Sequence, residues 1–368
     1  MQITRRLFSS ALAVCAAPAW IMRPTFAKFD QIWGAIRWDA WWGGSRDAVE
    51  AQKGLWPRKW QFRAPAWAKS DGLDRLAFAP TQESMDGEIQ AASEAGLKYW
   101  AYDYYPTDVD HDFMNALNFH RKSKIRNQVN YCLILQLGHW GGENDYKSIN
   151  GSIAAFAMDD FYQKVHGRPV VFLLWNPSVF ATRFESETAH VAARITDLRR
   201  QIEAAGSPSP YIALMTPNDA KTMKEIGADA LASYAVGPRM GRTPMSFFAY
   251  DRYVRKRWLA QLDTGAQVVP TVMTGWDMRP IAENPPPWYK NAVPENAETG
   301  FVMKASPDGL AEHMRAGIDF LNDHPSQCRE KLGLIYSWDE CSEGGNVLSP
   351  TLGDPKGRLL SVLGSIIK

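Results

Sequence analysis

Short apolar segments rich in β-branched and aromatic residues recur along the whole chain, and stretches with a helical pattern separate them. The eight segments lie at 32–38, 98–104, 130–136, 169–175, 211–215, 228–234, 267–273 and 333–338. Amphipathic spacing typical of helices appears between them, at 85–95, 112–122, 187–205, 219–226, 245–260 and 307–322. Strands that alternate with helices pair in parallel through right-handed crossovers. Eight such units predict an α/β fold, a single (β/α)8 TIM barrel with enlarged βα loops, since about 250 residues suffice for a compact one.

A doubly wound open sheet is the alternative architecture. The sequence argues against the dinucleotide-binding form of it, because no G-x-G-x-x-G follows the first predicted strand. No Pro- or Ser-rich linker divides the chain, and no internal repeat is present. We therefore expect one catalytic domain that covers 28–368.

The first residues are typical of a twin-arginine export signal. Arg5 and Arg6 are paired, Phe8 follows, and a short apolar stretch covers 11–20. This predicts a signal peptide at 1–27 and a periplasmic or secreted protein, without stable membrane insertion after signal removal. The segment 1–27 holds three arginines and no acid, so 38 of the 41 basic residues remain against 40 acidic ones. Such a balance gives no reason to expect a nucleic-acid partner.

Aromatic, acidic and glycine residues follow the predicted strands more often than they precede them, and the βα loops of a TIM barrel carry its active site. A flat aromatic face with a carboxylate at its rim suits a pyranose ring. Packing in the core is the alternative for each aromatic residue. For the G-W-D motif at 275–277, the alternative is that Trp276 fills the mouth of the barrel while Asp277 pairs with Arg279. The candidate substrate-binding residues are Trp41, Trp42, Asp103, Tyr105, His139, Trp140, Trp276, Asp277 and Trp338.

Two glutamates follow the eighth predicted strand, in Y-S-W-D-E-C-S-E-G-G. Glycoside hydrolysis requires two carboxyl groups that flank the scissile bond, and one of them must stay protonated. Burial and a neighbouring like charge favour that protonated form. A solvated acidic turn would explain an isolated E-x-x-E equally well. The position after the last strand favours catalysis, so Glu340 and Glu343 are the candidate catalytic residues.

The segment 338–344, W-D-E-C-S-E-G, resembles the W-N-E-W-x-E-G signature of glycoside hydrolase family 99, relatives of which also occur in bacterial polysaccharide loci. The segment 268–280, VVPTVMTGWDMRP, is similar to the G-W-D-x-x-P/R segment of that family. Weaker likeness covers 95–106, 138–144 and 167–175 in the same order. The resemblance therefore spans most of 28–368, although only the last two strands carry specific motifs.

The resemblance implies a (β/α)8 barrel and a retaining, endo-acting enzyme related to α-mannosidases and mannanases. In that family the first glutamate acts as a base on the 2-hydroxyl of the sugar and gives an anhydro-sugar intermediate, whereas the second is the acid/base. Carried over, Glu340 is the base and Glu343 the acid/base, with no metal or organic cofactor. We therefore expect a glycoside hydrolase that cuts a poly- or oligosaccharide.

This sequence departs from the family signature at three positions, where Asp339, Cys341 and Ser342 replace its usual residues. A non-catalytic glycan-binding or polysaccharide-assembly protein on the same barrel is therefore the alternative function. A hydrolase that uses the cysteine as its nucleophile is a third hypothesis. A zinc hydrolase is not expected, because the chain has no H-E-x-x-H and no C-x-x-C.

Overall fold

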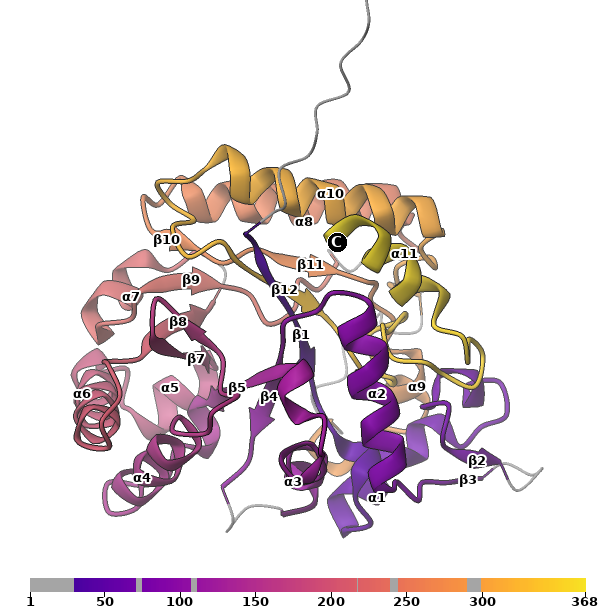
Figure 1. Cartoon of the computed structure of the whole chain (residues 1–368), viewed down its shortest axis with the longest axis horizontal. Helices are drawn as coiled ribbons and strands as arrows, with labels where there is room; N and C mark the ends of the chain where they lie inside the picture. Colours follow the sequence, from indigo (N-terminus) through magenta and orange to yellow (C-terminus); the bar gives the residue numbers. More distant parts are fainter. Residues whose placement is uncertain (1–29, 71–74, 107–110, 217, 239–243, 290–298) are drawn as a thin grey trace, which may run out of the picture.

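The computed structural model describes residues 30–70, 75–106, 111–216, 218–238, 244–289 and 299–368, so the predicted signal peptide lies outside the described residues. Its main sheet is parallel and curls around a central axis (Figure 1). All eight predicted strands are confirmed. They are β1 (Ile32–Arg37), β4 (Tyr99–Tyr104), β5 (Asn130–Gln136), β7 (Arg168–Leu174), β8 (Tyr211–Met215), β9 (Ala230–Ala232), the pair β10 (Gln267–Val268) and β11 (Thr271–Met273), and β12 (Leu332–Tyr336).

The seventh predicted strand closes the sheet into a barrel. Its first part, β10, pairs with β9, and its second part, β11, pairs with β12. Between them the Val269 amide donates to Leu231 on one side, and the Leu334 amide donates to the Pro270 carbonyl on the other. Proline has no N–H, which interrupts the ladder at this point. Because β12 pairs with β1, the sheet returns to its first strand. The expectation of a TIM-barrel α/β fold is thus confirmed.

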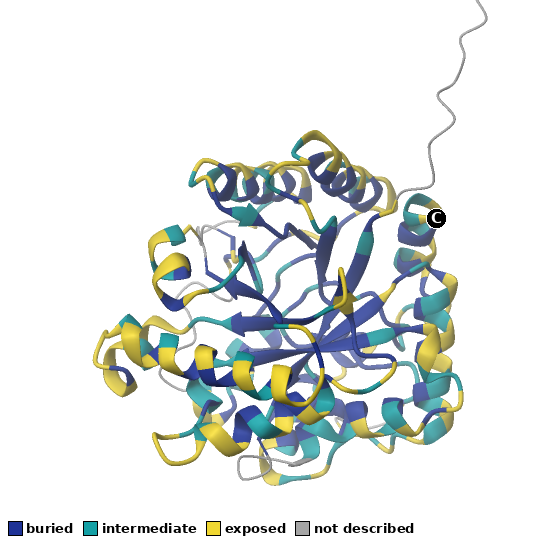
Figure 2. Ribbon diagram, turned by 60° about the vertical axis from the view of Figure 1, so that its left-hand side comes forward, coloured by how far each residue is buried: buried dark blue, intermediate teal, exposed yellow. Residues whose placement is uncertain are grey.

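The strands are buried on both faces, which is why they appear in the sequence as apolar runs and not as alternating patterns. Every residue of β4 and of β12 is buried, and the outward faces of the surrounding helices carry the exposed residues (Figure 2). Two glycines make room for large rings in this packing. A Cβ atom on Gly34 would lie 2.5 Å from the ring of Tyr99, and one on Gly333 would lie 2.3 Å from the ring of Trp33.

The helices cover the outside of the barrel, and all six expected helices are confirmed. The side chains of Thr81, Asp219 and Ser306 cap the N-termini of three of them. The barrel helices are α2 (Gln82–Glu94), α3 (Asn115–Lys122), α4 (Tyr146–Phe156), α6 (Thr188–Ala204), α7 (Ala220–Ile226), α8 (Phe247–Leu262) and α10 (Pro307–Asp323). The loops and the C-terminal segment add α1 (Arg46–Gln52), α5 (Pro177–Arg183), α9 (Arg279–Glu283) and α11 (Arg358–Ile367).

Three short strands lie outside the barrel ring. β2 (Lys69–Ser70) and β3 (Leu76–Ala77) form an antiparallel pair in the first long loop. β6 (Lys164–Val165) pairs antiparallel with the start of β7. Among the described helices, none combines the length and the apolar character that crossing a membrane requires.

The contact between Gly333 and Trp33 predicts a measurable effect on stability. The Gly333→Ala variant places a methyl group against a ring that is itself 1% exposed, and overpacking of this kind costs about 1–3 kcal/mol of unfolding free energy. Urea denaturation checks this. The matched control is Gly87→Ala in α2, where a Cβ atom would meet nothing within 4 Å and helix propensity predicts a small gain. Equal urea midpoints for Gly333→Ala and the parent would contradict the packing argument.

Candidate active site

The loop after β12 forms a tight turn that carries both glutamates. The amides of Glu343 and Gly344 donate to the Glu340 carbonyl, over 3.2 and 2.7 Å. A Cβ atom on Gly344 would lie 2.8 Å from that carbonyl oxygen, and Gly345 has a φ of +73°, in the left-handed region that favours glycine. The two glycines of the motif therefore permit the turn that brings the glutamates together.

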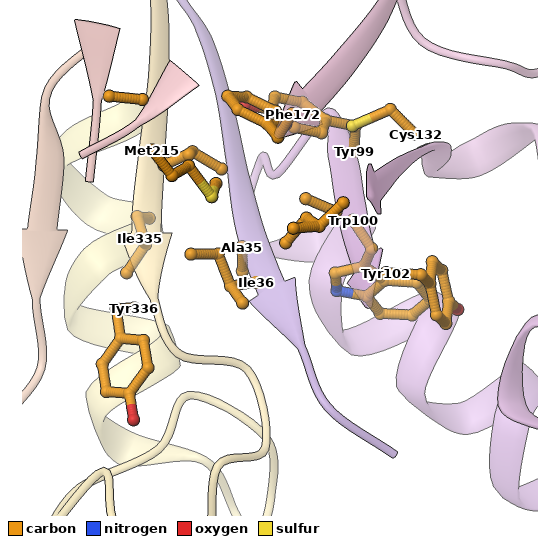
Figure 3. Packing of buried hydrophobic residues seen from close by; sticks show 14 of the residues in the cluster. Ala35, Ile36, Tyr99, Trp100, Tyr102, Cys132, Phe172, Met215, Ile335 and Tyr336 are labelled. Atoms are coloured by element: carbon orange, nitrogen blue, oxygen red, sulfur yellow. The ribbon is translucent and has the colours of Figure 1, made fainter. Parts of the chain in front are cut away.

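Glu343 accepts hydrogen bonds from two tyrosines. The Tyr336 hydroxyl lies 3.1 Å from Oε1, and the Tyr289 hydroxyl lies 3.2 Å from Oε2. Tyr336 ends β12 and belongs to the packed barrel interior (Figure 3). Burial raises the pKa of the Glu343 carboxyl above its usual range, although the hydrogen bonds from the tyrosines act to lower it. A half-buried carboxyl with a raised pKa can serve as a general acid.

Glu340 is 2% exposed and shares a tyrosine hydroxyl with a second carboxyl. The Tyr234 hydroxyl contacts Glu340 Oε1 and lies 2.9 Å from Asp103 Oδ2. The other oxygen, Asp103 Oδ1, is buried without a hydrogen-bond partner in the described part of the chain. Burial raises the pKa of both carboxyls well above the usual range, and the charge of Glu343 adds to the effect on each of them.

These carboxyls open into one cleft of about 500 Å³, a volume within the range of small-molecule sites. The cleft lies at the ends of β4, β5, β7 and β12, so it occupies the face where TIM barrels place their chemistry. Its lining, as far as the described residues form it, includes four carboxyl groups but neither lysine nor arginine. The lining residues are Trp38, Asp47, Asp103, Tyr105, Phe113, Gln136, His139, Leu174, Asn176, Tyr234, Ile281, Trp288, Tyr289, Glu340, Ser342 and Glu343.

Five of the predicted site residues therefore meet in this cleft: Glu340, Glu343, Asp103, Tyr105 and His139. The Tyr105 ring lies 4.9 Å from the His139 ring, measured between centroids, and its hydroxyl accepts a hydrogen bond from an indole N–H at 2.8 Å. Both rings come from loops that directly follow strands, as the sequence predicts.

Four of the predicted tryptophans lie in the core and do not line the cleft. Trp41, Trp42, Trp140 and Trp338 are each 2% exposed or less. Three of their indole N–H groups donate to protein acceptors: Trp41 to the Asp339 carbonyl, Trp140 to an asparagine and Trp338 to a glutamate. Their contacts match the packing alternative. For Trp41 and Trp42 the reason is local, because the chain after β1 coils into a 3-10 helix (Ala40–Trp42) in which both residues are buried.

The GWD motif supports the cleft from outside it. The Trp276 ring stacks on Tyr336, with centroids 5.9 Å apart. Asp277 bonds to the guanidinium groups of Arg63 and Arg279, which matches the predicted alternative of a pair with Arg279. Burial would raise the pKa of Asp277, but the hydrogen bonds from Arg279 and the charge of Arg63 bring it below the usual range. The Asp277 amide also donates to the Glu343 carbonyl over 2.7 Å, so the motif fixes the loop that carries the two glutamates.

The three departures from the family signature have different environments. Only Ser342 lines the cleft. Asp339 is buried and accepts from the Trp38 amide over 3.2 Å. Cys341 is 1% exposed and borders a separate cavity of about 40 Å³. Burial raises the pKa of the Cys341 thiol well above the usual range, so the geometry disfavours the nucleophilic-cysteine hypothesis.

The three tyrosines that contact the carboxyls were not among the predicted site residues: Tyr234 and Tyr289 line the cleft, and Tyr336 reaches Glu343 from the end of β12. Tyr234 and Tyr336 stand at the ends of predicted strands, a signal that could have identified them. Trp288, which is 42% exposed at the cleft, comes from the Pro-rich stretch of the long loop after β11. Within the described ranges, no group of three or more His, Cys, Asp or Glu side chains is arranged to hold a metal ion.

No protein-family model and no curated protein matches the chain. Solved structures do resemble it. A protein described as glycoside hydrolase-like superposes with a TM-score of 0.60 at 13% identity, over 94% of this chain and 96% of its own. The GH99 endo-alpha-mannosidase from Bacteroides thetaiotaomicron, in complex with BIS-TRIS-propane, gives a TM-score of 0.56 at 11% identity, over 92% and 98%. The chain therefore shares its fold with glycoside hydrolases that include a GH99 enzyme.

The raised pKa of Glu340 predicts a pH-dependent cost to stability. A carboxyl whose pKa is higher in the folded chain than in the unfolded chain, where it is about 4.3, binds more protons when folded, so stability falls as the pH rises between the two values. The Glu340→Gln variant removes this loss. We expect it to exceed the parent in unfolding free energy by more at pH 8 than at pH 5, with the difference on the order of 1 kcal/mol.

Thermal and urea unfolding at both pH values measure this difference. Glu312→Gln on α10, at an exposed carboxyl outside the cleft, is the matched control and should show no such pH dependence. A Glu340→Gln difference that is the same at pH 5 and pH 8 would contradict the prediction.

Proposed function

We propose that this protein is a retaining glycoside hydrolase, similar to family 99, that cuts a poly- or oligosaccharide at internal bonds. The observation that carries the proposal is the pair Glu340 and Glu343, which one turn presents to one cleft and whose pKa values are both raised. The common fold with glycoside hydrolases supports the reaction class. The retaining course rests on the resemblance of the segment 338–344 to the family 99 signature.

In the proposed first step, Glu343 donates its proton to the leaving glycosidic oxygen. The 2-hydroxyl of the sugar gives its proton to Glu340, and its oxygen bonds to the anomeric carbon as the glycosidic bond breaks. The Tyr336 and Tyr289 hydroxyls donate to the Glu343 oxygens and stabilise the carboxylate that remains. Each proton and electron pair has a stated acceptor, so this step requires no metal or organic cofactor.

In the proposed second step, water attacks the anomeric carbon of the anhydro sugar. Glu343 takes a proton from that water, the bond to the 2-oxygen breaks, and Glu340 returns its proton to this oxygen. The product keeps the starting anomeric configuration, and both glutamates return to their initial protonation states.

Sugar binding in this proposal rests on the aromatic residues that line the cleft. Trp288 presents a partly exposed ring, and Tyr105 lines the same cleft. Such faces suit the apolar side of a pyranose. Gln136 and Asn176 offer amide groups for its hydroxyls. The four carboxyls of the lining favour a glycan without acidic groups, and the described lining residues include neither lysine nor arginine.

The catalytic assignment predicts a specific loss in Glu343→Gln. Proton transfer typically contributes about 10²–10⁴-fold, so we expect kcat to fall at least about 100-fold while the glycan still binds. The assay screens the mature protein against neutral polysaccharides by release of reducing ends, and NMR of the first product reports the anomeric configuration. Glu312→Gln, a distant exposed position, is the control for the substitution itself.

A glycan that binds the parent and Glu343→Gln equally, with no product from either, would favour the non-catalytic glycan-binding or polysaccharide-assembly protein. Product with inverted configuration would overturn the retaining mechanism. Product release by Glu343→Gln at the parent rate would overturn the assignment of Glu343.

We also propose export to the periplasm or beyond, which rests on the twin-arginine-type segment at 1–27. Lysine keeps the charge of each arginine but is a poor substitute for paired arginines where the guanidinium is read specifically. Replacing Arg5 and Arg6 by lysine should therefore retain the chain in the cytoplasm, measured by fractionation and immunoblotting. The control is the replacement of Arg23, which lies outside the pair. Equal export of all variants would contradict the proposal.

A further inference from the structure

The contacts of Tyr234 limit how the protons can be distributed between two carboxyl groups of the cleft. Its hydroxyl lies within hydrogen-bond distance of Asp103 Oδ2 and Glu340 Oε1. A phenol has one hydrogen and can donate it to only one of the two oxygens. An ionised carboxylate only accepts, so the second contact is a hydrogen bond only if that carboxyl is protonated and donates to the phenol oxygen. If both contacts are hydrogen bonds, the three side chains hold one more hydrogen than the phenol supplies.

We propose that Asp103 holds this extra proton and acts as a positioning residue that keeps Glu340 ionised. This inference rests on the proposed function, because Glu340 must accept a proton there. Asp103 donates to the Tyr234 oxygen, and Tyr234 in turn donates its hydrogen to Glu340. The arrangement carries one negative charge, and that charge lies on the carboxylate that faces the sugar.

The surroundings of the two carboxyls favour Asp103 as the protonated one. Asp103 is 6% exposed, and its Oδ1 has no partner among the described residues. An unpartnered buried oxygen is costly in a carboxylate and less so in a neutral carboxylic acid. The charged groups that act on Asp103 are Asp39 and Glu343, both acids, and burial raises its pKa well above the usual range.

The influences on the pKa of Glu340 differ from those on the pKa of Asp103. The repulsion that raises its pKa comes first from Glu343 among its charged neighbours, then from Asp103 and Asp39. In the proposed resting state Glu343 and Asp103 are both protonated, so these two repulsions are absent. The hydrogen bond from Tyr234 favours the ionised form of Glu340.

The proposed arrangement accounts for every proton in the first step. Before it, Asp103 and Tyr234 each carry one hydrogen and Glu340 carries none. When Glu340 takes the proton of the sugar hydroxyl on its free oxygen, the group of three becomes neutral, and the hydrogen bonds through Tyr234 need not rearrange. A transfer from Asp103 to Tyr234 with simultaneous transfer from Tyr234 to Glu340 would give the alternative form, in which Glu340 is neutral and cannot act as the base.

Substitutions at Asp103 separate this role from others. Asparagine is neutral and keeps a donor for the Tyr234 oxygen, so we expect Asp103→Asn to keep kcat within about tenfold of the parent. Leucine has no donor, so we expect Asp103→Leu to lower kcat at least about 100-fold with a smaller change in KM. We also expect the acid limb of its kcat profile to move to higher pH, because Glu340 then gains a proton more easily. Thermal unfolding of each variant checks that it folds.

A second measurement needs no substrate. Difference infrared spectroscopy at neutral pH detects the carbonyl band of a protonated carboxylic acid. We expect Asp103→Asn to lose the intensity of one such group and Glu340→Gln to keep it. The reverse pattern would place the proton on Glu340 and overturn the inference, as would an Asp103→Asn variant as inactive as Asp103→Leu, or a fully active Asp103→Leu. If no glycan is hydrolysed but the infrared pattern is as expected, the proposed function fails and the proton assignment stands.

Discussion

The buried guanidinium of Arg37 joins the loop that carries Glu340 and Glu343 to the first strand and to α2. Arg37, at the end of β1, is fully buried and pairs with Asp39, with Glu88 of α2 and with Asp339, over 2.6, 2.8 and 3.4 Å. Its charge also faces the ring of Trp100, 4.6 Å from the centroid. A buried charge without partners costs several kcal/mol, so these contacts constrain one another. Because Asp339 directly precedes Glu340, the position of the turn that carries the two glutamates depends on this pairing.

The contacts of Arg37 explain how Asp339 can stand where the family signature has an asparagine. One guanidinium cannot balance three carboxylates, and burial, followed by the charge of Asp39, raises the pKa of Asp339 well above its usual range. A protonated aspartate is neutral, like the asparagine of the signature, and can donate a hydrogen bond. Cys341 lies behind the loop and not in the cleft. Of the three departures, only Ser342 contacts the space for the sugar directly.

The barrel could be predicted from the sequence because parallel strands that are buried on both faces leave apolar runs of the right length. The E-x-x-E pair could be predicted because one loop contains it. The partners of the pair could not, because they depend on barrel closure: Tyr234 is 131 residues from Asp103 and 106 from Glu340. For the tryptophans after strands, the sequence could not distinguish substrate binding from core packing. The direction of a ring such as Trp41 depends on how the loop coils.

Charged hydrogen-bond donors contact Asp277 and neutral ones contact Glu343, and the pKa values of these two neighbouring carboxyl groups move in opposite directions. Asp277 and Glu343 belong to loops joined by a backbone hydrogen bond, yet two arginines lower the pKa of Asp277, while that of Glu343 is raised. The donors to Glu343 are tyrosine hydroxyls, which stabilise a carboxylate without a positive charge. A lysine or arginine at either tyrosine position would favour the ionised form and remove the acid. Arginines therefore fix the loop of Asp277, whereas tyrosine hydroxyls contact Glu343 and Glu340 without adding a positive charge.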